Sequence, residues 1–394
     1  MPRDVNGVYS LPPGNPVVPN TIIATNWANT TMNDIATALT NSLSIDGSVT
    51  TAKLANSSVT TVKIADGNVT RTKLSTSLQN NIGGKNYFIN GSFNIWQAGN
   101  LAMGTGNRYS ADMVSNSSVG TTYSSTQTAW PVGQTDVDPR AVSYIRNAVI
   151  SVAGASNFSN MQFTMEDVRT LAGKQVTVSF WAQCTTATQP ISLELSQLFG
   201  AGGSATVRVN MGQKTITGAW QRFTATANVP SISGKTIGTM PHSLILTIWL
   251  DAGSDYNART GSLGQRTGGW NFWGLKVEEG SEATPFVVEE YSTDYDRCCR
   301  FYWAPPLDGG ASGGPICWSG DVGALSAYHT VATFPTKMAY VPSVTCVEGT
   351  STGFAATPAT PSSTTTVACR VFKTATAIGA ARIYSGTLIA DARL

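Results

Sequence analysis

Two groups of residues in this sequence have the spacing of a catalytic site, and the first is a glycine-rich motif. Residues 310–314 spell GASGG and match the Gly-x-Ser-x-Gly pattern of a serine nucleophile. That pattern needs a strand before it and a helix after it, yet Pro315 and a strand-like segment follow. The chain also offers only His242 and His329 as general bases. We therefore interpret 310–314 as a loop.

The second group is a set of carboxylates that lie close together in the sequence. A glycosidase needs two carboxyl groups held on opposite sides of a sugar ring. The carboxylates here follow a predicted strand and its turn, which favours a solvated edge; they are Glu278, Glu279, Glu282, Glu289 and Glu290. We also interpret Asp136 and Asp138 as turn residues rather than cation ligands. We predict a protein that is not an enzyme and has neither a cofactor nor a metal.

Sugar recognition is the chemistry that the sequence favours. Aromatic side chains provide rigid apolar faces for sugar rings, and neighbouring polar groups orient the hydroxyls. Most aromatic residues fall within predicted strands and are expected to pack in a core, which remains the alternative role for every candidate. The ligand-binding candidates are those in loop-like contexts with polar neighbours: Trp130, Asp255, Tyr256, Arg259, Trp318, Tyr328 and His329.

Composition excludes several kinds of partner. Only 12% of the residues are charged, the net charge is +2, and the lysines are dispersed, so we expect no nucleic-acid binding. The longest apolar run, 244–250, is too short to cross a bilayer, so we expect no membrane insertion. The N-terminus lacks a secretion-signal pattern, and the six cysteines lack metal spacing. We expect these cysteines to be reduced and mostly buried.

A ten-residue repeat is the most regular feature of the chain. Residues 47–76 consist of GSVTTAKLAN, SSVTTVKIAD and GNVTRTKLST. Each unit has two apolar positions five residues apart, which is too little to offset the entropy of ordering it alone. We therefore predict association with identical chains along the apolar line, with a solvated Ser/Thr linker as the alternative. The predicted trimer interface contains Val49, Leu54, Val59, Ile64, Val69 and Leu74.

The elements that must position these residues are mainly strands. A short helix is expected over 27–43 with Asn26 as its N-cap, and another helical segment over 289–299. Alternating apolar and polar residues predict strands throughout the rest. The predicted strands are 86–95, 142–152, 176–183, 191–196, 206–211, 220–229, 244–250 and 270–278, then 316–318, 326–334, 343–348, 365–373 and 382–389.

Several segments resemble parts of bacteriophage tail fibres. The opening 1–44 resembles their virion-anchoring segment, and the SVTTAKLA-type repeat resembles their shaft units. NYFINGSFNIWQAG, LAGKQVTVSFWAQ and GWNFWGLKVEEGSEATPFVVEEYSTDYDRCCRFYW resemble a carbohydrate-module-like jelly roll, and FPTKMAYVPSVT and SGTLIADARL a small closing β domain. We expect an all-β fibrous homotrimer in four parts: an attachment segment with a short helix (1–44), a shaft and hinge (45–85), a jelly-roll β-sandwich (86–290) and a smaller C-terminal β-sandwich (291–394).

The resemblance implies a function and a location. Such a fibre is a receptor-binding adhesin that recognises a host surface polysaccharide or lipopolysaccharide during adsorption. Its N-terminus would attach to a tail or baseplate protein, and it would be assembled in the host cytoplasm as part of the virion. Two alternatives remain open at this point: a neck, collar or head fibre, and a polysaccharide-degrading tailspike.

Overall fold

The computed structural model describes residues 22, 25–40, 64, 73, 84–186, 188–305, 316, 318–348, 351–383 and 386–393. They belong to two compact units, Met1–Ser75 and Thr76–Leu394. In the first unit, helix α1 covers Thr25–Thr40. It begins two residues earlier than predicted, so Asn26 lies within the helix instead of capping it. No described helix is long and apolar enough to cross a membrane.

The predicted trimer interface lies almost wholly outside the described residues. Of its six positions only Ile64 is described, and its side chain is 38% exposed. Association through the repeat therefore stays a prediction; its undescribed positions are Val49, Leu54, Val59, Val69 and Leu74.

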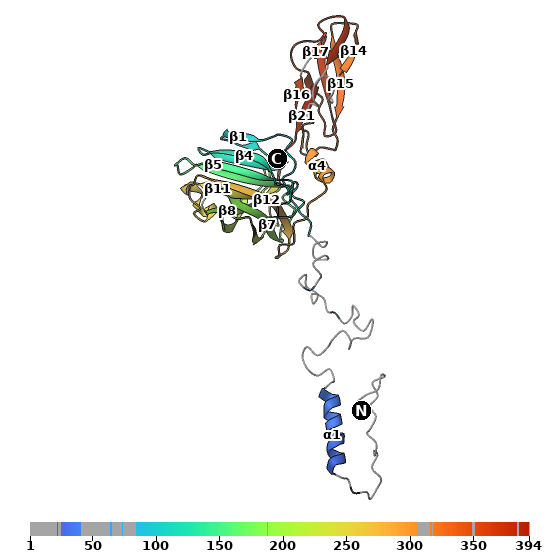
Figure 1. The fold of residues 1–394 in the computed structure, drawn as a ribbon. Helices are drawn as coiled ribbons and strands as arrows, with labels where there is room; N and C mark the ends of the chain where they lie inside the picture. Colours follow the sequence, from blue (N-terminus) through green and yellow to red (C-terminus); the bar gives the residue numbers. More distant parts are fainter. Residues whose placement is uncertain are drawn as a thin grey trace. The chain divides into compact units, whose positions relative to one another are not determined.

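The second unit contains a sandwich of two six-stranded antiparallel sheets, which confirms the predicted β-sandwich (Figure 1). Sheet A has the strand order β1 (Leu101–Gly104), β4 (Thr122–Ala129), β5 (Ser143–Ile150), β12 (Gly268–Glu279), β7 (Gln175–Cys184) and β10 (Gln221–Asn228). Sheet B has the order β2 (Arg108–Tyr109), β3 (Val114–Val119), β6 (Phe158–Glu166), β11 (Ser243–Ala252), β8 (Gln189–Leu198) and β9 (Val207–Ile216).

The core of the sandwich lies between the two sheets. Successive side chains on a strand point to opposite faces, so the apolar members of each alternating pair meet in the middle. Val178 and Phe180 come from sheet A, and Leu193, Leu246 and Ile248 from sheet B. The residues between these core-facing positions in β6, β8 and β11, which are mostly polar, therefore line the outer face of sheet B.

The predicted strand at 86–95 is wrong. This segment forms turns, with Asn90 and Phe93 at φ values of 61° and 56°. The buried Asn90 side chain donates hydrogen bonds to the carbonyls of Ile95 and Asp112, at 3.0 Å each, and accepts one from the Ile95 N–H at 3.2 Å. Asparagine tolerates positive φ better than most residues, and its amide replaces the ladder bonds that a strand would make.

The C-terminal part begins with helix α4 (Tyr291–Cys299) and continues as three small sheets instead of the predicted second sandwich. The predicted strand at 382–389 is in fact two strands in different sheets, β20 (Gly379–Ile383) and β21 (Gly386–Asp391). The three strand orders are β13 (Tyr302–Trp303), β21, β16 (Ser343–Glu348); β14 (Trp318–Val322), β20, β17 (Ser351–Thr352); and β15 (Ala327–Thr333), β19 (Ala368–Thr374), β18 (Thr360–Ser362).

Arg393, which follows β21, ties this C-terminal part to the sandwich. Its guanidinium lies 3.9 Å from the ring centre of Tyr109 in β2 and 3.8 Å from that of Tyr302 in β13. It also donates two hydrogen bonds to Asp391, at 3.0 and 2.6 Å. Both parts therefore share one cation that is stacked on aromatic rings.

Candidate functional site

The outer face of sheet B carries a polar groove that encloses about 150 Å³. The groove lies over four adjacent strands, and helix α3 (Asn257–Thr260) contributes Arg259 to its lining. Its lining residues include Gln162, Ser196, Arg208, Ile245, Thr247 and Arg259.

Strand register explains why these side chains gather. Thr247 on the central strand β11 lies opposite Gln162 of β6 on one side and Glu194 of β8 on the other. In the next row, Ile245 lies opposite Ser196, which in turn lies opposite Arg208 of β9. Directly opposed residues have Cβ atoms about 5 Å apart and share one face, so the polar set crosses the sheet as two neighbouring rows.

A buried ion pair fixes the geometry of the groove. The Glu194 side chain has no exposed surface, and its two carboxylate oxygens accept hydrogen bonds from Arg259 at 2.8 and 2.7 Å. Ser196 donates a third bond at 2.9 Å, and Arg208 lies 3.9 Å away. A buried carboxylate needs such complete pairing. Two of the five N–H donors of Arg259 are used on Glu194, and its side chain is still 33% exposed at the groove.

Aromatic rings support Arg259 from the other side. Its guanidinium carbon lies 4.7 Å from the Trp249 ring centre and 5.9 Å from that of Tyr256. The two rings are 5.1 Å apart and also pack against Phe158. Trp249 is only 1% exposed. The rings therefore hold the guanidinium in place and are not themselves an open platform for a sugar.

The segment that carries Arg259 is a short helical segment held by the sheet. It consists of a 3-10 turn at Ser254–Tyr256 and helix α3, which ends at Gly261 with φ 65°. The Gln213 amide of β9 donates to the carbonyls of Thr260 and Gly261, at 2.9 and 2.8 Å. A left-handed residue after a helix favours glycine, so Gly261 allows the chain to turn back after the helix.

The three predicted site residues between 255 and 259 differ in their position relative to the groove. Arg259 lines the groove, so its predicted role in ligand binding stays a prediction. Tyr256 packs behind it against Trp249, and its hydroxyl donates to the Ser156 carbonyl at 3.3 Å. Asp255 is exposed and is not among the residues that line the groove.

Trp130 has a packing role. Its side chain is 8% exposed, and its ring lies 4.9 Å from that of Tyr144 and 4.7 Å from that of Trp220. Val137 and Trp273 complete this cluster. Trp130 is therefore covered by its own neighbours and offers no free ring face.

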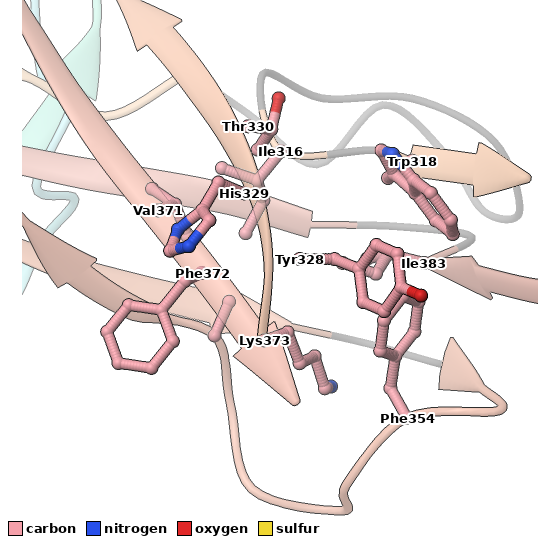
Figure 2. A pocket seen from close by; sticks show the side chains of 11 residues that line it. Ile316, Trp318, Tyr328, His329, Thr330, Phe354, Val371, Phe372, Lys373 and Ile383 are labelled. Carbon is pink, nitrogen blue, oxygen red and sulfur yellow. The ribbon is translucent and has the colours of Figure 1, made fainter. Parts of the chain in front are cut away.

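The C-terminal candidates also form a packed cluster, which Figure 2 shows from close by. The Trp318 ring lies 5.8 Å from that of Tyr328 and 5.3 Å from that of Phe354. His329 faces away from them and lies 5.8 Å from the Phe372 ring. The free space between these side chains is only about 10 Å³, which is about one water molecule. The cluster is a small core.

Two of the carboxylates considered for catalysis form ion pairs with lysines. Glu278, predicted to be solvated, is buried with Lys276 at 3.1 Å and accepts the Thr284 N–H at 2.7 Å. Glu279 instead pairs with Lys174 in a half-exposed bridge of 3.0 Å. Residues 310–314 lie outside the described ones. The described part of the chain holds no group of acidic, His and Cys residues that suits a metal ion.

The five described cysteines are free and buried. Burial raises the pKa of the Cys184 thiol to about 11 and that of the Cys299 thiol to about 11. A thiol with so high a pKa stays protonated at neutral pH and is a poor nucleophile. These cysteines fill space as small apolar groups.

Most of the groove was missed in the sequence because its residues are polar members of buried strands. Glu194, Ser196 and Thr247 lie in segments that the alternation correctly predicted as strands. The available signal was Ser192, Glu194 and Ser196 at intervals of two, since a glutamate in an otherwise neutral buried strand needs a cationic partner. The partner, 65 residues away at Arg259, is not evident from that spacing.

Comparison with known proteins gives structural likenesses only. No family model and no curated protein matches the sequence. Among solved structures, the CBM22-1 xylan-binding domain of Xyn10C from Paenibacillus barcinonensis is 10% identical, with a TM-score of 0.30 over 51% of this chain and 98% of that one. The family 11 carbohydrate-binding module from Clostridium thermocellum, in complex with a β-1,3-1,4-mixed-linked tetrasaccharide, is 10% identical, with a TM-score of 0.27 over 47% and 98%. At such low scores the likeness carries no argument about function, which has to come from the groove itself.

Proposed function

We propose that this protein is a non-catalytic adhesin that binds a saccharide in the groove on sheet B. The observation that carries the proposal is the buried Glu194–Arg259 pair, which fixes polar side chains around an open space. Saccharide hydroxyls both donate and accept hydrogen bonds. Gln162 and Thr247 offer both functions, and Arg259 offers donors. A preorganised set of this kind loses less conformational entropy when it binds.

For the whole chain, we propose a bacteriophage tail fibre that recognises a polysaccharide or lipopolysaccharide of the host surface. The order of segments that resemble such fibres supports this, from the attachment segment 1–44 through the repeat to the β domains. The fibre would be a homotrimer in the virion, assembled in the host cytoplasm and attached to a tail or baseplate protein. Three grooves in one trimer raise the effective affinity of a weak single site. A neck, collar or head fibre would carry the same groove.

Saccharide binding is tested with the full-length protein. A panel of bacterial surface polysaccharides is screened first, and the best ligand is then measured by isothermal titration calorimetry. The double variant Gln162→Leu with Thr247→Val removes two of the hydrogen-bonding groups of the groove, and we expect affinity to fall at least tenfold. The matched control is Thr330→Val in the C-terminal cluster. Unchanged affinity in the double variant, or release of oligosaccharides from the ligand, contradicts the proposal.

The fibre assignment has its own test. Light scattering of the full-length protein should give three times the mass of one 41.5 kDa chain, and Val59→Asp with Ile64→Asp should reduce that mass to one chain. We also expect the wild-type protein to compete with phage adsorption to its host. Immunolabelling of virions distinguishes the tail from the neck and head. A monomer that binds saccharide supports the groove and contradicts the fibre.

A further inference from the structure

A second hollow, of about 270 Å³, lies at the end of β6 next to the groove. Its walls come from three segments far apart in the sequence: the chain before the sandwich, the end of β6, and helix α4 with the residues after it. We call it the α4 hollow; its polar and charged lining residues include Lys85, Tyr87, Thr164, Glu166, Arg297 and Arg300.

The α4 hollow has an excess of positive charge. It is lined by three cations and one carboxylate, and Glu166 is already paired with Arg300, whose Nη2 lies 2.8 Å from Oε1. The Lys85 ammonium lies 4.7 Å from the ring centre of Tyr87 and forms no ion pair with any described residue. Two cations therefore face the hollow in addition to the balanced pair.

Arg297 is only loosely held by its neighbour. Its Nη1 lies 3.6 Å from the Asp294 carboxylate, and its side chain is 34% exposed. Asp294 also accepts the Asn90 N–H at 3.3 Å, and burial raises the pKa of its carboxyl. The guanidinium fork of Arg297 can therefore bind an entering anion without breaking a short ion pair.

The α4 hollow adjoins the groove along β6. Thr164 lines the hollow and Gln162 lines the groove, two positions apart on the same strand. This separation corresponds to about 7 Å, and both side chains lie on the outer face. Thr164 is also directly opposite Ile245, another residue of the groove. One extended ligand on this face would contact both sites.

We infer that the α4 hollow binds an anionic group, a carboxylate or a phosphate, of the saccharide that occupies the groove. Its attachment to a saccharide rests on the proposed function, whereas anion binding in the hollow does not. Lys85 and Arg297 supply the charge, and the Arg300–Glu166 pair holds the wall in position. Charge-assisted hydrogen bonds of this kind are about twice as strong as neutral ones.

Nuclear magnetic resonance of the arginine side-chain N–H groups in the full-length protein tests this inference. Three probes are titrated: galacturonate for a carboxylate, inorganic phosphate for a phosphate, and galactose as the neutral control. We expect saturable shifts of the Arg297 and Arg300 signals with at least one anion and none with galactose. The tighter anion identifies the group. Absence of saturable shifts with both anions overturns the inference.

Two charge-neutralising variants make the test specific. Lys85→Gln with Arg297→Gln should weaken anion binding about tenfold or more. Lys174→Gln is the matched control, because it removes a surface cation that pairs with Glu279 and is not among the residues that line the hollow. Equal affinity in the wild type and the double variant, or equal loss in both variants, contradicts the inference.

The same titrations separate this inference from the proposed function. Neutral oligosaccharides should shift the Arg208 and Arg259 signals of the groove and leave Arg297 unchanged. Anion binding at Arg297 without any saccharide response at Arg259 supports anion binding in the α4 hollow and contradicts saccharide binding in the groove. A saccharide response at Arg259 without anion binding at Arg297 does the reverse.

Discussion

The groove on sheet B and the aromatic cluster of the C-terminal sheets contain similar residues, but their aromatic rings pack differently. Each has a tryptophan, a tyrosine and a polar side chain nearby: Trp249 and Tyr256 with Arg259, and Trp318 and Tyr328 with His329. In the groove the aromatic rings pack behind a charged side chain and leave about 150 Å³ open. In the cluster they pack against each other and leave about 10 Å³.

The difference lies in how much of the charged side chain each cluster leaves exposed. Both clusters bury aromatic surface, which stabilises the fold by the hydrophobic effect. Both also contain a buried charge paired with a residue of another segment: Glu194 with Arg259 in the groove, and Lys373 with Glu348 in the cluster. The two pairs differ in exposure: the Arg259 side chain is still 33% exposed at the groove, whereas the Lys373 side chain is only 3% exposed.

The largest effect is expected from breaking the buried pair. Glu194→Ala leaves Arg259 without its partner, and breaking such pairs costs about 3–5 kcal/mol. We expect about 3 kcal/mol in the free energy of unfolding, because Arg259 is one-third exposed, together with loss of saccharide binding. Urea denaturation and calorimetry measure the two effects. Glu279→Ala, in a half-exposed pair, should cost less than about 1 kcal/mol; equal costs for the two variants would erase the distinction.

A smaller effect is expected in the C-terminal cluster. Trp318→Ala removes a half-buried ring that contacts Tyr328 and Phe354. For a fully buried ring this change would cost about 3–5 kcal/mol. Because Trp318 is half-buried, we expect a loss of about 2 kcal/mol in the free energy of unfolding, with saccharide affinity unchanged. Thermal unfolding and calorimetry test this. A fall in affinity similar to that of the groove variants would mean that the cluster is a binding site after all.

A third change affects binding with little change in stability. Thr247→Val keeps the shape of the side chain and removes its hydroxyl from the centre of the groove. One hydrogen bond contributes about 1 kcal/mol, so we expect about a fivefold loss of affinity. The same replacement at Thr330, in the C-terminal pocket, should leave affinity unchanged. Calorimetric titration of both variants with one saccharide sharpens the comparison.

The smallest effect is expected at Asp112, a buried carboxylate that, unlike Glu194, has no directly bonded cation. Asp112 is 1% exposed and accepts hydrogen bonds from the Gln97 backbone and amide, at 2.9 and 2.6 Å. Burial raises the pKa of Asp112 in the folded state. Its contribution to stability is therefore present below the unfolded pKa and is lost as the pH rises through the folded one.

Asp112→Asn removes this dependence on pH. We expect the unfolding free energy of the wild type, relative to the variant, to decrease as the pH rises above about 4, the unfolded pKa of an aspartate. Urea denaturation of both proteins at each pH gives the difference. Asp255→Asn, at an exposed carboxylate, controls for the loss of one charge. A difference that grows with pH contradicts the assigned direction.

The sequence predicted the strands of the central sheets because their apolar alternation is strong. β7, β8, β11 and β12 all cover the predicted ranges, and β10 falls one residue short of its range at each end. β3, β4 and β6 were missed, since their Ser, Thr and Asn residues weaken the alternation. Tertiary contacts with neighbouring strands make those segments extended, which local preference does not reveal.

The site was only partly predictable for a related reason. Arg259 was identified from its aromatic and polar neighbours in one loop, which is local information. Glu194 and Thr247 become part of the site only when β8 and β11 pair in register. The packing of Trp130 against Trp220 likewise depends on contact between segments 90 residues apart. Local patterns find the strands, but pairing decides which side chains share a face.

The strand order of the first C-terminal sheet has a consequence for the time at which this part of the chain can fold. β21, the last strand in the sequence, is the middle strand between β13 and β16. During synthesis from the N-terminus, every strand of the sandwich has been made before β21 exists. Until β21 is made, β13 and β16 lack the strand that pairs with them, and their exposed edges can pair with other segments or chains. All strands of the sandwich are therefore synthesised before β21, and the C-terminal sheet can close only once β21 has been made.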